Sequence, residues 1–556
     1  MFRSSLSSTS PTPARLPFYA RLSSAVAMAL LLGCGLSACG GGDDTPDTAT
    51  ATAPLTTASA PNATSTDAER LQALAGLQFP SWPDTAKFVY HDEAPELPFS
   101  GEQLQVASNG NVFMTWHATH KTAQGQIDGT DINVTQYDAA TKVWSATTVV
   151  ANVPFPDAGG GYVYNLKAVP LPDGDMGVFW DVVDRPAYDF FAFNKPPELR
   201  FSRYSAASRQ WSAPQSIPGT YAIYRADDGW WIAPAGDGRI LLVWQSDTSQ
   251  HARFYSTRDG TWSEPQDVGT LTGRPFRPNA FRSAVFFDFN RSGSGIVTGY
   301  WPETREGEAP VSLYFDAARQ AWRAVTVSPA PAERYRYGGK SYAVDEQGNV
   351  WSALQDQTSY REVATGVAGT RLVLSKWSAQ TGQIVSNPYV YALDTFAKDV
   401  SLNLTAQGGF VTWADTHRES TGNQVLRYVS FAPDGSLTSH LLGPELDMRG
   451  TPQSSLVDLR TRMGADGTAY FAWSVSSYNG REALIEHRFS VLDPVSRQWS
   501  APSVILPARP LLADRSGLHF QLNPAGMGAL VLLDQTRNFV NGAPQSELDV
   551  RVIAME

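Results

Sequence analysis

Short polar turns followed by strongly apolar runs recur along the whole chain. The turns are Asn109-Gly110, Asp173-Gly174, Asp237-Gly238, Ser294-Gly295, Gln347-Gly348, Gly408-Gly409, Asp466-Gly467 and Ala525-Gly526. The second residues of successive turns are 64, 64, 57, 53, 61, 58 and 59 residues apart. A repeat of this length is typical of radially repeated units. We therefore expect about eight copies of one supersecondary unit.

Each repeat has the pattern of four short strands. Runs such as VFMTWHA and ILLVWQS follow the turns directly, and short β-type runs alternate with further turns elsewhere. Later in the repeat an aromatic residue precedes a turn that leads to tryptophan, as in YDAATKVWSAT (137–147) and YSAASRQWSAP (204–214). Four antiparallel strands repeated around an axis form a β-propeller blade. The sequence predicts an all-β propeller of about eight four-stranded blades, with seven as the alternative.

The last repeat has three strand-like runs before Glu556. An unassigned strand-like run, Ala86 to His91, precedes the first repeat. We expect this N-terminal strand to complete the last blade and close the propeller, which would leave no sheet edge at the seam. The best helical pattern, Thr66 to Gly76, predicts a single helix before the repeats.

Eleven of the 16 tryptophans occupy two positions of the repeat. Those in second strands are Trp116, Trp180, Trp244, Trp301, Trp413 and Trp473, and those that start fourth strands are Trp144, Trp211, Trp262, Trp322 and Trp499. Large rings fill the wedge between twisted sheets. The periodicity favours packing between blades over a ring of sugar platforms.

The N-terminal segment has the features of a secretory signal. Residues 1–38 carry three arginines and no acidic residue, and their apolar run (22–33) is too short to span a bilayer comfortably. Leu36-Ser37-Ala38-Cys39 resembles a bacterial lipobox. The resemblance implies a lipoprotein signal peptide over 1–38, lipidation of Cys39, and attachment to the membrane through the lipid alone. Gly40 follows the cysteine, and the absence of aspartate there favours the outer membrane.

Residues 39–68 are rich in Thr, Ala, Pro and Gly and nearly free of large apolar side chains. Such a segment cannot bury enough surface to fold, so we interpret it as a flexible tether. The remaining residues, 69–556, are assigned to the propeller domain.

Charge and cysteine content exclude several classes of function. Removing the three arginines of the signal takes the formal charge from −11 to −14, and an acidic body is a poor nucleic-acid binder. The two cysteines are Cys34, in the signal, and Cys39, so no thiol remains for a disulfide, a thiolate metal site or a nucleophile. His117 and His120 lie three residues apart on an expected strand and should face opposite sides. We expect no metal site and no cofactor.

Cations cluster in the connections that lead into first strands, where propellers commonly bind ligands. They are Arg225, Arg274, Arg277, Arg282, Arg334, Arg336, Lys340, Lys398, Arg449, Arg509 and Arg515, and Tyr335 accompanies them. Just beyond the second strands lie Asp181, Asp184, Asp247, Asp356, Asp415 and Asp534. One interpretation is a ligand site in which Arg225, Arg277, Arg282, Arg334, Arg336 and Tyr335 hold an acidic sugar, because guanidinium binds carboxylate or sulfate in a bidentate way. The other is that the arginines pair with the aspartates and neutralise a crowded face.

Two family resemblances bear on function. YSTRDGTW (255–262) resembles the sialidase Asp-box, with its aspartate displaced by one residue, and the body is similar to sialidase-like propellers of bacterial lipoproteins. That resemblance implies a glycoside hydrolase with three arginines, a Tyr–Glu pair and an acidic proton donor. Phe276-Arg277-Pro278 lacks the isoleucine of the family motif, and no Tyr–Glu pair can be assigned. Asp138 to Trp144 resembles the repeat of outer-membrane assembly lipoproteins and of quinoproteins, and the quinoprotein enzyme is rejected because its cysteine pair is missing.

The sequence therefore predicts a lipid-anchored propeller of the cell envelope or surface that binds a glycan or an envelope protein without catalysis. The alternatives are a sialidase-like hydrolase or lyase acting on acidic polysaccharide, and an outer-membrane assembly scaffold.

Overall fold

The computed structural model describes the strands and many of the turns that follow residue 86. The described residues are 87–92, 100–155, 161–163, 165–183, 198–221, 229–246, 249–272, 285–299, 312–327, 340–356, 370–385, 389–393, 396–405, 408–416, 424–432, 446–447, 455–463, 468–478, 483–493, 498–510, 515–522, 528–540 and 543–555. All of them lie in the unit Thr45–Glu556. The expected signal, tether and helix lie outside the described residues. Within the described part, no helix is long and apolar enough to cross a membrane.

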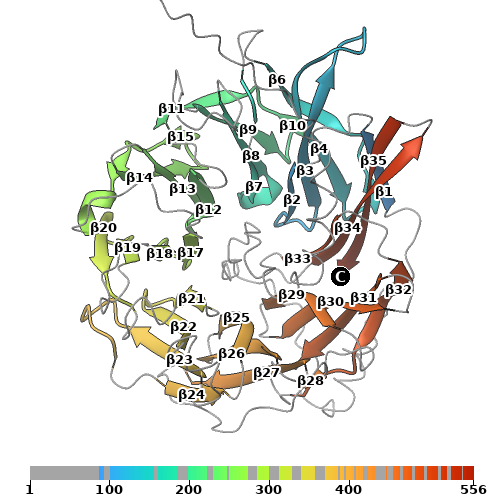
Figure 1. The fold of residues 1–556 in the computed structure, drawn as a ribbon. Helices are drawn as coiled ribbons and strands as arrows, with labels where there is room; N and C mark the ends of the chain where they lie inside the picture. The colour runs from blue at the N-terminus through green and yellow to red at the C-terminus, as the bar shows by residue number, and fades with distance from the viewer. Residues whose placement is uncertain are drawn as a thin grey trace, which may run out of the picture. The chain divides into compact units, whose positions relative to one another are not determined.

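These residues form eight antiparallel sheets, numbered here in chain order (Figure 1). Sheet 1 is β2 (Ser100–Val106), β3 (Val112–Lys121), β4 (Ile127–Asp138), β5 (Val143–Trp144) and β6 (Thr148–Pro154). Sheet 2 is β7 (Leu166–Pro170), β8 (Met176–Val182), β9 (Glu198–Ser205), β10 (Gln210–Trp211) and β11 (Gln215–Tyr221). Sheet 3 is β12 (Trp230–Pro234), β13 (Arg239–Gln245), β14 (Gln250–Ser256), β15 (Thr261–Trp262) and β16 (Gln266–Asp267). Two short 3₁₀ turns are η6 (Pro172–Gly174) and η7 (Gly269–Thr272).

The other five sheets have four strands each. Sheet 4 is β17 (Val285–Phe289), β18 (Gly295–Gly299), β19 (Ser312–Asp316) and β20 (Ala321–Val325), and sheet 5 is β21 (Lys340–Val344), β22 (Val350–Asp356), β23 (Thr370–Trp377) and β24 (Tyr389–Leu393). Sheet 6 is β25 (Phe396–Thr405), β26 (Gly408–Thr416), β27 (Gln424–Phe431) and β28 (Leu446–Asp447), and sheet 7 is β29 (Ser455–Met463), β30 (Ala469–Tyr478), β31 (Ala483–Leu492) and β32 (Ser503–Pro510). Sheet 8 joins β1 (Lys87–Asp92) to β33 (Arg515–Leu522), β34 (Gly528–Val540) and β35 (Ala543–Met555).

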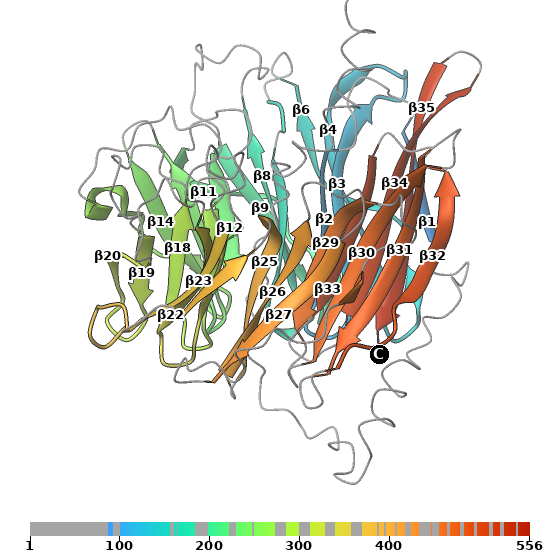
Figure 2. The ribbon, with the colours of Figure 1, turned by 60° about the horizontal axis from the view of Figure 1, so that its bottom comes forward.

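The sheets pack through their first strands. The first strands of successive sheets contact one another, from β2 with β7 through to β29 with β33, and β33 also contacts β2 (Figures 1 and 2). Antiparallel four-stranded units that meet side by side at their first strands are the construction of a β-propeller. The all-β propeller class expected from the sequence is confirmed.

The N-terminal strand belongs to the last sheet. β1 pairs antiparallel with β35 over six residues, from Lys87 opposite Arg551 to Asp92 opposite Ser546. The sheet order is β1-β35-β34-β33, so β1 is its fourth strand. This pairing gives β35 a backbone partner on its outer side.

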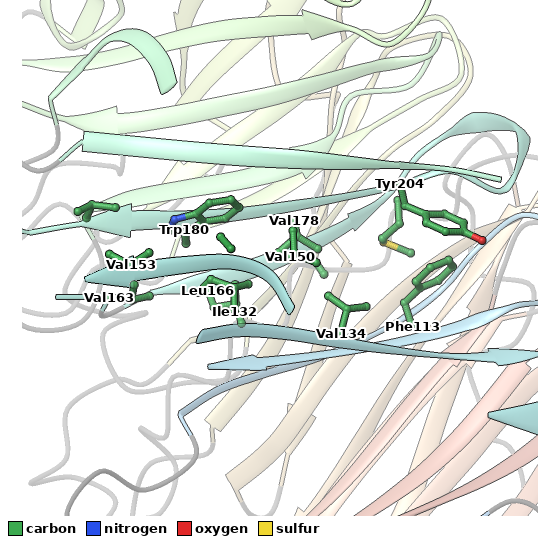
Figure 3. Packing of buried hydrophobic residues seen from close by; sticks show 14 of the residues in the cluster. Phe113, Ile132, Val134, Val150, Val153, Val163, Leu166, Val178, Trp180 and Tyr204 are labelled. Carbon is green, nitrogen blue, oxygen red and sulfur yellow. The ribbon is translucent and has the colours of Figure 1, made fainter. Parts of the chain in front are cut away.

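The tryptophans of the second strands form the core between sheets. Trp116, Trp180, Trp244, Trp413 and Trp473 are each at most 2 % exposed, and Trp301 lies outside the described residues. Figure 3 shows Trp180 and Val178 of sheet 2 packed with Ile132 of sheet 1. The fourth-strand tryptophans Trp211, Trp262, Trp322 and Trp499 are partly buried against the same kind of cluster. In these described positions the tryptophans serve packing between sheets, as the periodicity predicted.

The fourth strand of sheets 1 to 3 is interrupted, which corrects the single Trp-containing strand that the sequence predicted. In sheet 2 the serine after the tryptophan explains the break. The Ser212 backbone N–H donates to the carbonyl oxygen of Arg203 (2.8 Å), and its hydroxyl oxygen accepts the Arg203 N–H (3.0 Å). Ser145, Ser263 and Ser500 make the equivalent bonds. In sheet 4 this position is Arg323, and β20 pairs without interruption.

The turn between first and second strands uses a glycine in the left-handed region. Gly110 and Gly348 have φ of 84° and 82° and donate their N–H three residues back, to Ala107 and Asp345. In sheet 4 the residue with this role is Gly293 (φ 81°), which donates to Asn290. Gly295, assigned to the turn from the sequence, is instead the first residue of β18.

Candidate functional site

Two ends of the sheets can be distinguished. The entry end is the one at which first strands begin and second strands finish, for example at Leu166 and Val182 of sheet 2. The turn end carries the tight turns between first and second strands and between third and fourth strands. The candidate ligand site predicted from the sequence belongs to the entry end.

The predicted ligand residues themselves lie outside the described residues. They are Arg225 in segment 222–228, Arg277 and Arg282 in segment 273–284, and Arg334, Tyr335 and Arg336 in segment 328–339; Cys39 is likewise outside. The structure does describe the strands into which these segments lead, which are β12, β17 and β21. β12 contacts β17, and β17 contacts β21, so the three strands are consecutive neighbours.

Asp181 is a structural carboxylate at this end. It lies near the end of β8, is 1 % exposed, and accepts hydrogen bonds from the Asn165 backbone N–H (3.0 Å) and side-chain amide (2.7 Å). Its second oxygen also accepts the indole N–H of Trp230 (3.1 Å), the first residue of β12. A buried carboxylate is retained when donors satisfy its oxygens. Asp181 thus connects sheet 2 to the start of the first strand of sheet 3.

Lys167 brings a positive charge to the same interface. It lies on β7, is 5 % exposed, and its Nζ is 5.1 Å from the centroid of a Trp230 ring. A cation over an indole face is attracted by the ring quadrupole. Lys167 and Asp181 therefore both contact the indole of Trp230, a residue that the sequence analysis did not single out.

Sheet 3 also has polar residues at the entry end. The His251 ring stacks on Trp244 with centroids 5.3 Å apart, and its Nε2 is 3.0 Å from the Ser246 hydroxyl. Neither His251 nor Ser246 was singled out from the sequence. The signal that could have found His251 is its register, because it lies directly opposite the repeat-locked Trp244.

The strand pairing locates three other aspartates of the predicted set. Asp415 is paired with Ala397 at the start of β25, and Asp534 with Ser516 at the start of β33. Asp356 is opposite Arg371, near the start of β23. All three lie at the entry end, as predicted, while Asp184 and Asp247 are outside the described residues. Among the described aspartates of the predicted set, Asp181 is the one for which the structure gives side-chain hydrogen bonds, and these hold Asn165 and Trp230 in place.

The two histidines of the WHATH run have separate environments. Burial lowers the pKa of His117 to about 4, so its imidazole is neutral at pH 7. His120 is half-buried, with Nδ1 3.0 Å from an oxygen of Asp131 and Nε2 3.8 Å from one of Asp128. Across the described ranges, no three His, Cys, Asp or Glu side chains are arranged to hold a metal ion.

The Asp-box-like segment forms a tight turn at the turn end. The Ser256 hydroxyl donates to Asp259 (2.7 Å), and Gly260 adopts φ 67°. Trp262 then packs edge-on against Phe201, with centroids 5.8 Å apart. The same left-handed position recurs at Lys142, Arg209 and Gln320. This turn positions the tryptophan and places no catalytic group at the entry end.

Comparison with known proteins finds solved structures of low sequence identity. No protein-family model matches the chain, and no curated protein matches it. Among solved structures, an ulvan lyase of polysaccharide lyase family PL25, bound to -[GlcA(1-4)Rha3S]-, is 11 % identical with a TM-score of 0.32, covering 62 % of this chain and 78 % of its own. The intramolecular trans-sialidase from Ruminococcus gnavus is 13 % identical with a TM-score of 0.30, covering 67 % and 89 %. The Dos1 propeller is 7 % identical with a TM-score of 0.37, covering 81 % and 96 %.

Proposed function

We propose that this chain is a non-catalytic propeller that binds an acidic glycan at the entry end, through arginines of the connections into β12, β17 and β21. The observation that carries the proposal is that these first strands are consecutive neighbours, β12 contacting β17 and β17 contacting β21. Arginine-bearing connections that are separate in the sequence therefore lead into neighbouring strands.

Covalent geometry limits how far these arginines can lie from the strands. Arg225 precedes the first residue of β12 by five residues, Arg282 precedes that of β17 by three, and Arg336 precedes that of β21 by four. Because consecutive Cα atoms are about 3.8 Å apart, their Cα atoms stay within about 19, 11 and 15 Å of the strand starts. These limits are compatible with guanidinium groups of neighbouring connections reaching one anionic ligand, and guanidinium makes bidentate bonds to carboxylate or sulfate.

The described part of the entry end supports a preformed site. Asp181 binds the indole of Trp230, the residue at which the connection bearing Arg225 enters β12. Fixing the strand start restricts where the connection can end, and a preorganised site loses less conformational entropy on binding. The absence of an assignable Tyr–Glu pair in the sequence is the reason for proposing binding without catalysis.

The membrane attachment is part of the same proposal. Lipidation at Cys39 would hold the chain at the outer membrane, with residues 39–68 as the tether that lets the propeller reach a glycan or an envelope partner. Palmitate labelling of the expressed chain, with Cys39→Ala as the control, tests this step.

The glycan proposal is tested with the full chain on an array of neutral and acidic glycans. Arg277→Ala and Arg336→Ala should each lower the affinity for acidic glycans at least tenfold relative to the parent chain. Arg258→Ala, an exposed arginine of the turn end, is the matched control and should bind like the parent chain. Absence of acidic-glycan binding would contradict the proposal and favour a protein partner, whereas cleavage of a bound glycan would favour the sialidase-like alternative.

A further inference from the structure

A cavity lies at the turn end of the sheets, opposite the end of the proposed acidic-glycan site. It is a groove of about 540 Å³ between the first-to-second-strand turns of sheets 3, 4 and 5 and the third-to-fourth-strand turns of sheets 4 and 5. This volume is within the range of about 300 to 1,000 Å³ that small-molecule sites occupy. The groove depends on none of the arginines of the entry end.

The carboxylates of the groove are all paired with arginine. The pairs are Asp237 with Arg239 (2.9 Å), Asp316 with Arg319 (2.5 Å) and Glu346 with Arg291 (3.5 Å). A cation or an anion entering the groove would have to compete with these existing partners. The charges therefore favour a ligand that is itself neutral.

The other lining groups suit a ligand that both donates and accepts hydrogen bonds. Gln347 and Gln380 are exposed amides, and Ser292 is an exposed hydroxyl that donates to the Asn290 side chain (2.8 Å) and can accept through its oxygen. Amide and hydroxyl side chains offer donors and acceptors together, which is what sugar hydroxyls require. Ala317, Ala318 and Ala379 add methyl groups that can contact the C–H face of a sugar ring.

Gly348 lies on the groove lining close to the Tyr314 hydroxyl. Gly348 has φ 82°, and a Cβ added there would lie 2.6 Å from the Tyr314 hydroxyl and within 3.8 Å of Ala379 and Ser294. The Ser294 hydroxyl accepts the Ala317 N–H (3.1 Å), which fixes one wall to the floor. Hydrogen bonds between neighbouring turns thus hold a shaped polar surface at this end.

From this geometry we propose that the groove binds a neutral oligosaccharide, as a site separate from the acidic-glycan site of the entry end. Polar side chains of Gln347, Gln380 and Ser292 bind its hydroxyls, and the alanine methyls contact its apolar ring faces.

The test is a blocking substitution with a matched control. Ala318→Trp places a large ring in the groove, whereas Ala207→Trp makes the same change at the equivalent exposed turn position of sheet 2, outside the groove lining. Both residues are exposed, so the fold should tolerate each change, and circular dichroism verifies this. Binding to the full chain is measured by saturation-transfer NMR and calorimetry with neutral tri- and tetrasaccharides of glucose, xylose, mannose, galactose and N-acetylglucosamine.

We expect at least one of these oligosaccharides to bind, with affinity reduced at least tenfold by Ala318→Trp and unchanged by Ala207→Trp. Gln347→Ala combined with Gln380→Ala should weaken the same ligand without filling the groove. Absence of binding to every neutral oligosaccharide at millimolar concentration overturns the proposal, as does binding that Ala318→Trp leaves intact. Because Arg277→Ala should not affect this binding, its result is separable from that of the acidic-glycan proposal.

Discussion

Replacing Asp288 by asparagine should make the protein more stable at neutral and alkaline pH. Asp288 lies on β17, is buried, and accepts hydrogen bonds from the backbone N–H groups of Val344 on β21 and of Phe289. Burial raises its pKa from 3.8 to about 7, and the two N–H donors oppose the shift only partly. The corresponding first-strand positions of sheets 2, 3 and 5 are the apolar Val169, Ala233 and Ala343.

The magnitude follows from the difference in pKa between the folded and unfolded chain. The folded pKa is raised, so the folded state binds the proton more tightly. The protonated carboxyl contributes its full stabilisation of the folded state below pH 3.8, and this contribution is lost as the pH rises to about 7. A difference of about three units corresponds to about 4 kcal/mol, an upper limit for this buried group. Asparagine keeps an acceptor for Val344 and never ionises, so it should avoid this loss.

The assay is urea denaturation of the parent chain and of Asp288→Asn at several pH values from 4 to 9. The difference in unfolding free energy should be near zero at pH 4, grow by about 1.4 kcal/mol per pH unit, and level off above pH 7. Asp173→Asn, at an exposed turn, is the control and should show no such trend. Parallel stability curves for Asp288→Asn and the parent chain would refute the reasoning.

Three further substitutions test the fold and the entry end. Ser212→Ala removes the hydroxyl that accepts the Arg203 N–H and should lower the unfolding free energy by about 1 to 2 kcal/mol, with the exposed Ser208→Ala as control; equal losses would contradict the role given to Ser212. Trp180→Ala removes the indole from the core between sheets 1 and 2 and should lower the unfolding free energy by about 3 to 5 kcal/mol in urea denaturation. A decrease below about 1 kcal/mol would argue against the packing role of Trp180. Asp181→Ala leaves the Trp230 indole N–H and the Asn165 donors without their acceptor and should cost about 2 to 3 kcal/mol and weaken acidic-glycan binding; unchanged thermal unfolding would show that Asp181 does not hold the start of β12.

The repeat pattern predicted the fold well because its signals are local. An apolar run after a polar turn and a tryptophan at a fixed place in that run suffice to predict a second strand and its buried face, as Trp180 and Trp244 show. The pattern placed the turn of sheet 4 two residues late because it counted Gly295, whereas the hydrogen bond from the Gly293 N–H to Asn290 identifies the turn residue.

The site was less predictable because its contacts join distant segments. The bond from Trp230 to Asp181 spans 49 residues, and neither residue type signals the other in the sequence. The groove at the turn end combines five turns between residues 237 and 380, so no short motif marks it. The position of Asp288 varies among the repeats, from Ala343 in sheet 5 to Gln105 in sheet 1, so the pattern does not single it out. Its bond to Val344 becomes visible once sheets 4 and 5 are placed together.

Hydrogen–deuterium exchange of the full chain, with and without a saturating acidic glycan, tests the location of the proposed site most directly. We predict slower exchange in segments 222–228, 273–284 and 328–339, and unchanged exchange in the turns at the opposite end, such as 107–111 and 345–349. Protection confined to those turns, or no protection in the three arginine-bearing segments while the glycan is bound, would contradict the proposed site.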